Sequence, residues 1–91
     1  MPAEVIRKVI DGGLSLMSQE GRREILSDLA DGDTDKLARF IDNMTAAVGV
    51  SINELNIPKL DDLLSSINGA EAAADPEVKE YIKQLEKETL A

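Results

Sequence analysis

The side chains that carry most enzyme chemistry are scarce in this sequence. It contains no histidine and no cysteine, so it lacks the common imidazole proton shuttle and the thiolate nucleophile. What remains is 18 Asp and Glu residues. Paired carboxylates act as general acids and bases only where a cleft shifts the pKa of one of them, and adjacent acids such as Asp61 and Asp62 are unavoidable at this density. We therefore predict no catalytic residue, no cofactor and no enzymatic activity.

One acidic cluster has the spacing of a metal site. In Asp31-Gly32-Asp33-Thr34-Asp35 the acids occupy alternate positions, as at the start of an EF-hand calcium loop, which this segment resembles. The loop needs glycine at its sixth position and glutamate at its twelfth, where this sequence has Lys36 and Asp42. A periodic helical pattern also begins at Lys36 and leaves no room for the loop. We predict a glycine helix end followed by an acidic helix cap, and no metal ligand.

The length, the acidity and the expected helix number are similar to those of acyl carrier proteins. Such a carrier attaches phosphopantetheine to a serine in an Asp-Ser-Leu setting at a helix start. This sequence offers only Leu26-Ser27-Asp28, in the reverse order and within an expected helix. The resemblance therefore supplies no attachment site.

Charge and composition also restrict the partners. The chain of 91 residues carries a net charge of −8, which repels nucleic acid. A helix-turn-helix drawn over Val50 to Ser65 would direct Asp61 and Asp62 at phosphate, and only Arg22-Arg23 forms a local basic spot. The only two aromatic residues, Phe40 and Tyr81, give no platform for base stacking. We predict no nucleic-acid partner.

The apolar residues are too dispersed for a membrane span. No run approaches the roughly 18 apolar residues that a span requires, and charged residues such as Glu4 and Arg7 interrupt the N-terminal apolar residues, unlike a secretory signal. We predict no membrane contact and a cytoplasmic location.

The apolar spacing is helical along most of the chain, and no strand-like alternation extends beyond a few residues. We predict an all-α fold, a single helical domain over 1–91 built as a small orthogonal or up-down bundle of four to five short amphipathic helices. The expected helices begin at Ala3, after Ser18, after Asp33 or Thr34, at Pro58 and at Pro76, and the expected stops include Gly32, Gly49 and Asn68-Gly69. A short capping-box helix is expected at Ser51-Ile52-Asn53-Glu54.

The first helix has two interpretations. Gly12 and Gly13 interrupt its apolar pattern, and each glycine costs about 1 kcal/mol relative to alanine inside a helix. Either Gly12 ends a short helix, or one helix continues and Gly13 lets another backbone come close. We favour the break.

The third helix has the strongest pattern. Leu37, Phe40, Ile41 and Met44 recur at helical spacing, which predicts one buried face. We expect these four residues to form the centre of the core.

The last helix is the main functional candidate. Residues 70–75 are expected either to be helical or to connect flexibly to a helix over 76–90, which Asp75-Pro76-Glu77 begins. Its apolar stripe, which can pack on its own core, on a second copy or in a partner's groove, consists of Val78, Tyr81, Ile82 and Leu85.

By elimination, the sequence predicts a non-catalytic protein-protein interaction module: a small adaptor, regulator or assembly factor. The partner is another protein or a second copy, since 91 residues bury only about 60–65% of the surface of the unfolded chain. The alternative is an acidic inhibitor or nucleic-acid mimic that occupies a basic surface on its target.

Overall fold

The described part of the chain is helical. The computed structural model describes residues 3–55, 62 and 64–90, with the backbone alone for residues 51–55. These residues form α1 (Ala3–Ser15), α2 (Gln19–Leu29), α3 (Thr34–Leu55), α5 (Gly69–Ala74) and α6 (Pro76–Leu90), and no strand. The predicted all-α bundle of short helices is confirmed.

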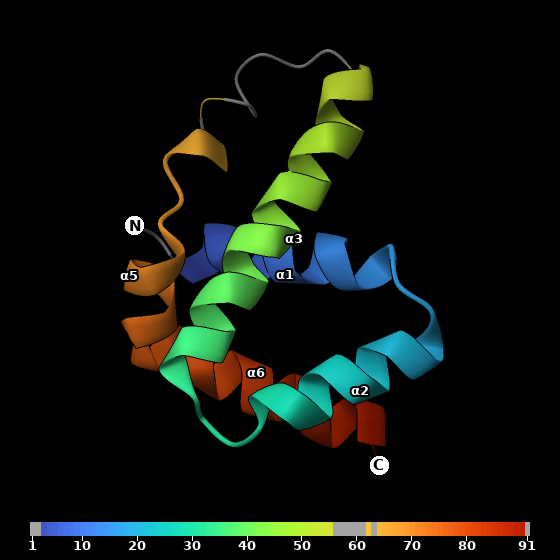
Figure 1. Ribbon diagram of the computed structural model, residues 1–91, viewed down its shortest axis with the longest axis vertical. Coiled ribbons are helices and arrows are strands. Elements are labelled where there is room, and N and C mark those ends of the chain that lie inside the picture. Colours follow the sequence, from blue (N-terminus) through green and yellow to red (C-terminus); the bar gives the residue numbers. More distant parts are fainter. Residues whose placement is uncertain (1–2, 56–61, 63, 91) are drawn as a thin grey trace.

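The helices form two groups that share one core. Helix α3 crosses α1 steeply and packs against α1 and α5, whereas α2 packs along α6, which also contacts α1 and α5 (Figure 1). Each of the five helices named above contributes to one cluster of buried apolar side chains. Its fully enclosed members include Ile6, Ile10, Leu26, Ile41 and Val78.

The predicted helix starts are confirmed where the sequence offered a short polar cap. Ser18 Oγ accepts the N–H of Gly21 at 3.0 Å, Asp33 Oδ1 accepts those of Asp35 and Lys36 at 2.9 and 3.2 Å, and Asp75 Oδ1 accepts that of Glu77 at 2.9 Å. Each oxygen satisfies first-turn N–H groups that have no partner within the helix.

The break expected at Gly12 is wrong, because α1 runs through both glycines to Ser15. Gly13 is buried, and a Cβ atom there would lie 2.8 Å from Cγ of Met44. A Cβ atom on Gly12 would lie 3.3 Å from Cγ2 of Val48. The glycines therefore let α3 come close, and this packing offsets their unfavourable helix propensity.

The stop expected at Gly49 is also wrong. Helix α3 continues to Leu55, so Ser51-Ile52-Asn53-Glu54 lies inside a helix and does not begin one. A glycine ends a helix efficiently only in the left-handed conformation, which Gly32 adopts with φ of +80° and Gly49 does not. The helix start expected at Pro58 lies outside the described residues.

The described helical residues before Asn68 end at Ser65, slightly earlier than the expected stop at Asn68-Gly69, and Asn68-Gly69 itself begins α5. The side chain of Asn68 accepts the N–H of Glu71 at 3.1 Å, and Gly69 is the first residue of α5. The alanine-rich segment that follows is helical, and Ala72 and Ala73 belong to the core.

The predicted core centre is largely confirmed. Leu37, Phe40 and Ile41 are buried in the core cluster. Met44 is only half-buried and packs against that cluster, because it also borders a groove.

Candidate functional site

The predicted contact stripe of α6 packs on the core of its own chain. Val78 and Ile82 are 0% and 2% exposed, while Tyr81 and Leu85 are half-buried against the same cluster. A partner could reach Val78 and Ile82 only if α6 separated from the core. Partner binding through the four residues stays a prediction.

Tyr81 joins α6 to α1 through its polar end. Its hydroxyl donates a hydrogen bond to Oδ1 of Asp11, and the guanidinium carbon of Arg7 lies 5.8 Å from the centre of its ring. Burial, followed by the hydrogen bond to Asp11, raises the pKa of Tyr81 to about 12. The sequence did not reveal this contact, because Asp11 lies 70 residues from Tyr81 along the chain.

An open groove with a mainly apolar lining lies between α2 and α3, and we call it the α2–α3 groove. It has a volume of about 230 Å³. Leu29 and Phe40 are buried at its base, and half-buried Met17, Ile25 and Met44 complete its apolar lining. Two of the three methionines of the chain therefore line one groove, and methionine side chains adapt to differently shaped partners.

The polar residues that border the α2–α3 groove are Asp28, Lys36, Arg39 and Asn43. Lys36 Nζ lies 3.2 Å from Asp28 Oδ1 and 3.0 Å from Asp31 Oδ2. Hydrogen bonds to these carboxylates raise the pKa of Lys36.

Arg39 is the remaining cation of this border. It is exposed and forms no ion pair with any other described residue. The described border of the groove therefore carries one positive charge available to a ligand.

The acidic turn between α2 and α3 has local roles. Asp31 Oδ1 accepts the N–H of Asp33 at 2.9 Å, and this bond, followed by the hydrogen bond from Lys36, lowers the pKa of Asp31. Asp33 caps α3, and Lys36 lies within that helix. No group of three metal-ligating side chains occurs among the described residues. The absence of calcium binding stays a prediction.

Sequence reasoning did not find the α2–α3 groove. A short turn joins α2 to α3, and helices joined by short turns usually pack on each other. Here α2 packs instead on α6, so the apolar side chains that face α3 keep partial access to solvent.

Comparison with known proteins gives no relative: no family model, no curated protein and no solved structure matches this chain. Within the described ranges, no helix combines the length and the apolar character needed to cross a membrane.

Proposed function

We propose that this protein is a non-catalytic protein-protein interaction module, an adaptor, regulator or assembly factor, and that the α2–α3 groove receives an apolar segment of another protein. The observation that supports the proposal is the accessible apolar lining of that groove, in which Met17, Ile25 and Met44 lie over a buried floor. An amphipathic helix that places its apolar face in such a groove is a recurrent mode of peptide recognition.

The border of the groove specifies the partner further. Lys36 is held by two aspartates, whereas Arg39 has no described ionic partner. The preferred occupant is therefore an amphipathic helix with a carboxylate beside its apolar face, positioned to meet the Arg39 guanidinium. This pairing contributes less than the apolar contact because it lies at an exposed rim.

A site-specific photo-crosslinker identifies the partner and the surface together. The reactive group is placed at Ile25 in the groove and, as a matched control, at Val50, an apolar residue that is 62% exposed and does not line it. We expect a defined adduct in the native source from Ile25 and none of the same mass from Val50. Equal labelling from both positions would contradict the proposal.

Calorimetry with the purified partner then tests the nature of the contact. We expect Ile25→Glu to weaken binding at least about tenfold and Arg39→Gln about three- to fivefold. We also expect a weak salt dependence and a negative heat-capacity change, the signature of apolar burial. A steep salt dependence with unchanged affinity of Ile25→Glu would instead favour an acidic inhibitor that covers a basic surface.

The stripe of α6 is tested in the same assay. Leu85 is half-buried on α6. Leu85→Asp therefore tests whether this helix binds the partner, without placing a charge in the fully buried core. If Leu85→Asp stays folded and loses partner binding while Ile25→Glu retains it, α6 is the contact surface and the groove is not.

A further inference from the structure

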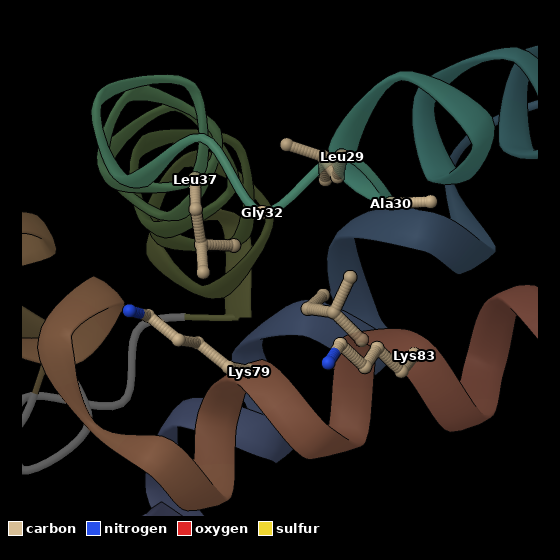
Figure 2. A pocket seen from close by; sticks show the side chains of 7 residues that line it. Leu29, Ala30, Gly32, Leu37, Lys79 and Lys83 are labelled. Carbon is tan, nitrogen blue, oxygen red and sulfur yellow. The ribbon is translucent and has the colours of Figure 1, made fainter.

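A second cavity lies where the end of α2, the turn at Gly32 and the start of α3 meet α6. Its volume is about 90 Å³. Its wall includes the buried side chains of Leu29 and Leu37 (Figure 2). Buried Ile82 also lines it. It is separate from the α2–α3 groove, although Leu29 contributes to both.

Two lysines border this cavity. Lys79 and Lys83 are one helical turn apart on α6, and both side chains lie along the side of the cavity formed by that helix (Figure 2). Neither forms an ion pair with another described residue, although Glu80 and Glu86 lie on the same helix. Like charges at this spacing repel each other.

The acidic turn on the opposite side of the cavity does not neutralise these lysines. Across the cavity, the turn at Gly32 carries Asp31 and Asp33. Asp31 binds Lys36, and Asp33 caps α3. In a protein of net charge −8, the mouth of this apolar cavity therefore holds two cations without a described counter-ion.

We propose that this cavity binds a branched aliphatic carboxylate, with the alkyl group against Leu29, Leu37 and Ile82 and the carboxylate between the ammonium groups of Lys79 and Lys83. The apolar wall selects against a small hydrophilic anion, which gains nothing from contact with it. The two ammonium groups favour a carboxylate over a neutral alkyl ligand, because hydrogen bonds from ammonium to carboxylate are stronger than those to a neutral group.

The volume limits the alkyl group. An apolar cavity of about 150 Å³ holds benzene, so a cavity of about 90 Å³ suits a smaller group, such as the isobutyl group of a leucine side chain or of 4-methylpentanoate. The same chemistry is offered by a free branched acid and by a protein chain that ends in leucine.

The first test uses 4-methylpentanoate as the probe and follows the backbone amides by two-dimensional NMR. We expect saturable shifts at Gly32, Leu37 and Lys83, with acetate and the neutral 4-methylpentanamide each binding at least about fivefold more weakly. No saturable shift with 4-methylpentanoate, or equal binding of acid and amide, would overturn the proposal. Equal binding would show that the lysine stems only cover the apolar wall.

Two kinds of variant locate the site. Lys83→Gln should weaken 4-methylpentanoate binding about three- to fivefold, and the double variant Lys79→Gln, Lys83→Gln should weaken it about tenfold. The control, Lys87→Gln, removes a charge from the same helix outside the cavity and should leave the affinity unchanged. Leu37→Phe enlarges a side chain of the cavity wall with both lysines intact, and should abolish binding while the dispersion of the spectrum shows a folded chain. Equal losses in Lys87→Gln and Lys83→Gln would refute the site.

The source of the carboxylate is decided by a matched pair of peptides that end in leucine, one with a free carboxylate and one amidated. A free-acid peptide that binds at least tenfold more tightly than 4-methylpentanoate, while its amide does not, assigns the site to a protein C-terminus. Binding of 4-methylpentanoate that is equal or tighter assigns it to a free acid. These outcomes do not depend on the α2–α3 groove, so the two proposals fail separately.

Discussion

The two sides of α3 pack in different ways. On one side α3 lies close to α1 and α5, and glycines stand at both contacts: Gly13 against Met44, and Gly69 against Ala38 and Asp42. On the other side α3 faces α2 across the α2–α3 groove, where Met17, Ile25 and Met44 stay partly accessible. Small residues let helices close on each other, whereas larger side chains that are not interlocked leave a surface that another molecule can occupy.

The contact at Gly69 shows how little space separates α3 from α5. The N–H of Gly69 donates to Asp42 Oδ1 at 3.0 Å, and a Cβ atom at this position would lie 2.5 Å from the backbone carbonyl oxygen of Ala38. Because a backbone atom of a packed helix cannot move aside cheaply, glycine is required here for a steric reason. The groove side has no comparable constraint, and it is therefore the better place for a variable contact.

The largest expected effect comes from a residue that belongs to both the core and the groove. Phe40 is 4% exposed and lines the base of the groove. We expect Phe40→Ala to lower the free energy of unfolding by about 3–5 kcal/mol, a loss that can unfold a domain of this size. Urea denaturation followed by circular dichroism measures it, and a loss below about 1 kcal/mol would show that this face of α3 is peripheral.

The next largest effect distinguishes a glycine that close helix packing requires from a glycine that alanine can replace. We expect Gly69→Ala to destabilise the fold by about 1–3 kcal/mol, because the new methyl group meets the backbone of α3. The matched control is Gly49→Ala. Among the described residues, a Cβ atom there meets only Cδ1 of Leu64, at 3.9 Å. Alanine is also a better helix former, so we expect stabilisation by about 0.5–1 kcal/mol. Thermal unfolding of both variants decides it, and equal destabilisation would remove the distinction.

A smaller effect concerns the contact of α6 with α1. The pKa of Tyr81 is raised to about 12 in the folded chain, against about 10 in an unfolded chain. The stabilisation from its protonated hydroxyl is therefore complete below about pH 10 and is lost as the pH rises toward 12. We expect Tyr81→Phe to be less stable than the parent by about 1 kcal/mol near neutral pH, and the difference to shrink in alkali.

Urea unfolding of the parent and of Tyr81→Phe at matched pH values measures that difference. Other effects of alkaline pH are common to both chains, so only the difference between the two chains reports on Tyr81. A difference that stays constant from neutral to strongly alkaline pH would show that the bond to Asp11 contributes nothing.

The smallest effect is self-association through α6. In the folded chain Val78 and Ile82 are enclosed, so a contact between copies through this stripe requires α6 to move, and two chains of net charge −8 repel each other. We expect weak association that strengthens as salt screens the repulsion. Sedimentation equilibrium at low and moderate salt measures it, and a monomer under both conditions would leave only a contact with a different protein.

The sequence determined the local features of this protein. Ser18, Asp33 and Asp75 mark helix starts because a side-chain oxygen two or three residues before an unpaired N–H group satisfies it whatever the rest of the chain does. Leu37, Phe40 and Ile41 mark a buried face because helical spacing places them on one side. Both kinds of signal depend only on neighbours along the chain.

The tertiary structure decided which glycines interrupt a helix and which surface stays open. Gly13 and Gly49 lie within helices that continue through them, while Gly32 takes a positive φ in a turn. A capping sequence follows both Gly32 and Gly49, so this local signal does not separate the glycine that ends a helix from the one that does not. The difference at Gly13 comes from Met44, a residue far away in the chain. The α2–α3 groove likewise exists because α2 packs on α6. That packing depends on the apolar surface buried by the whole folded chain, which cannot be read from any single segment.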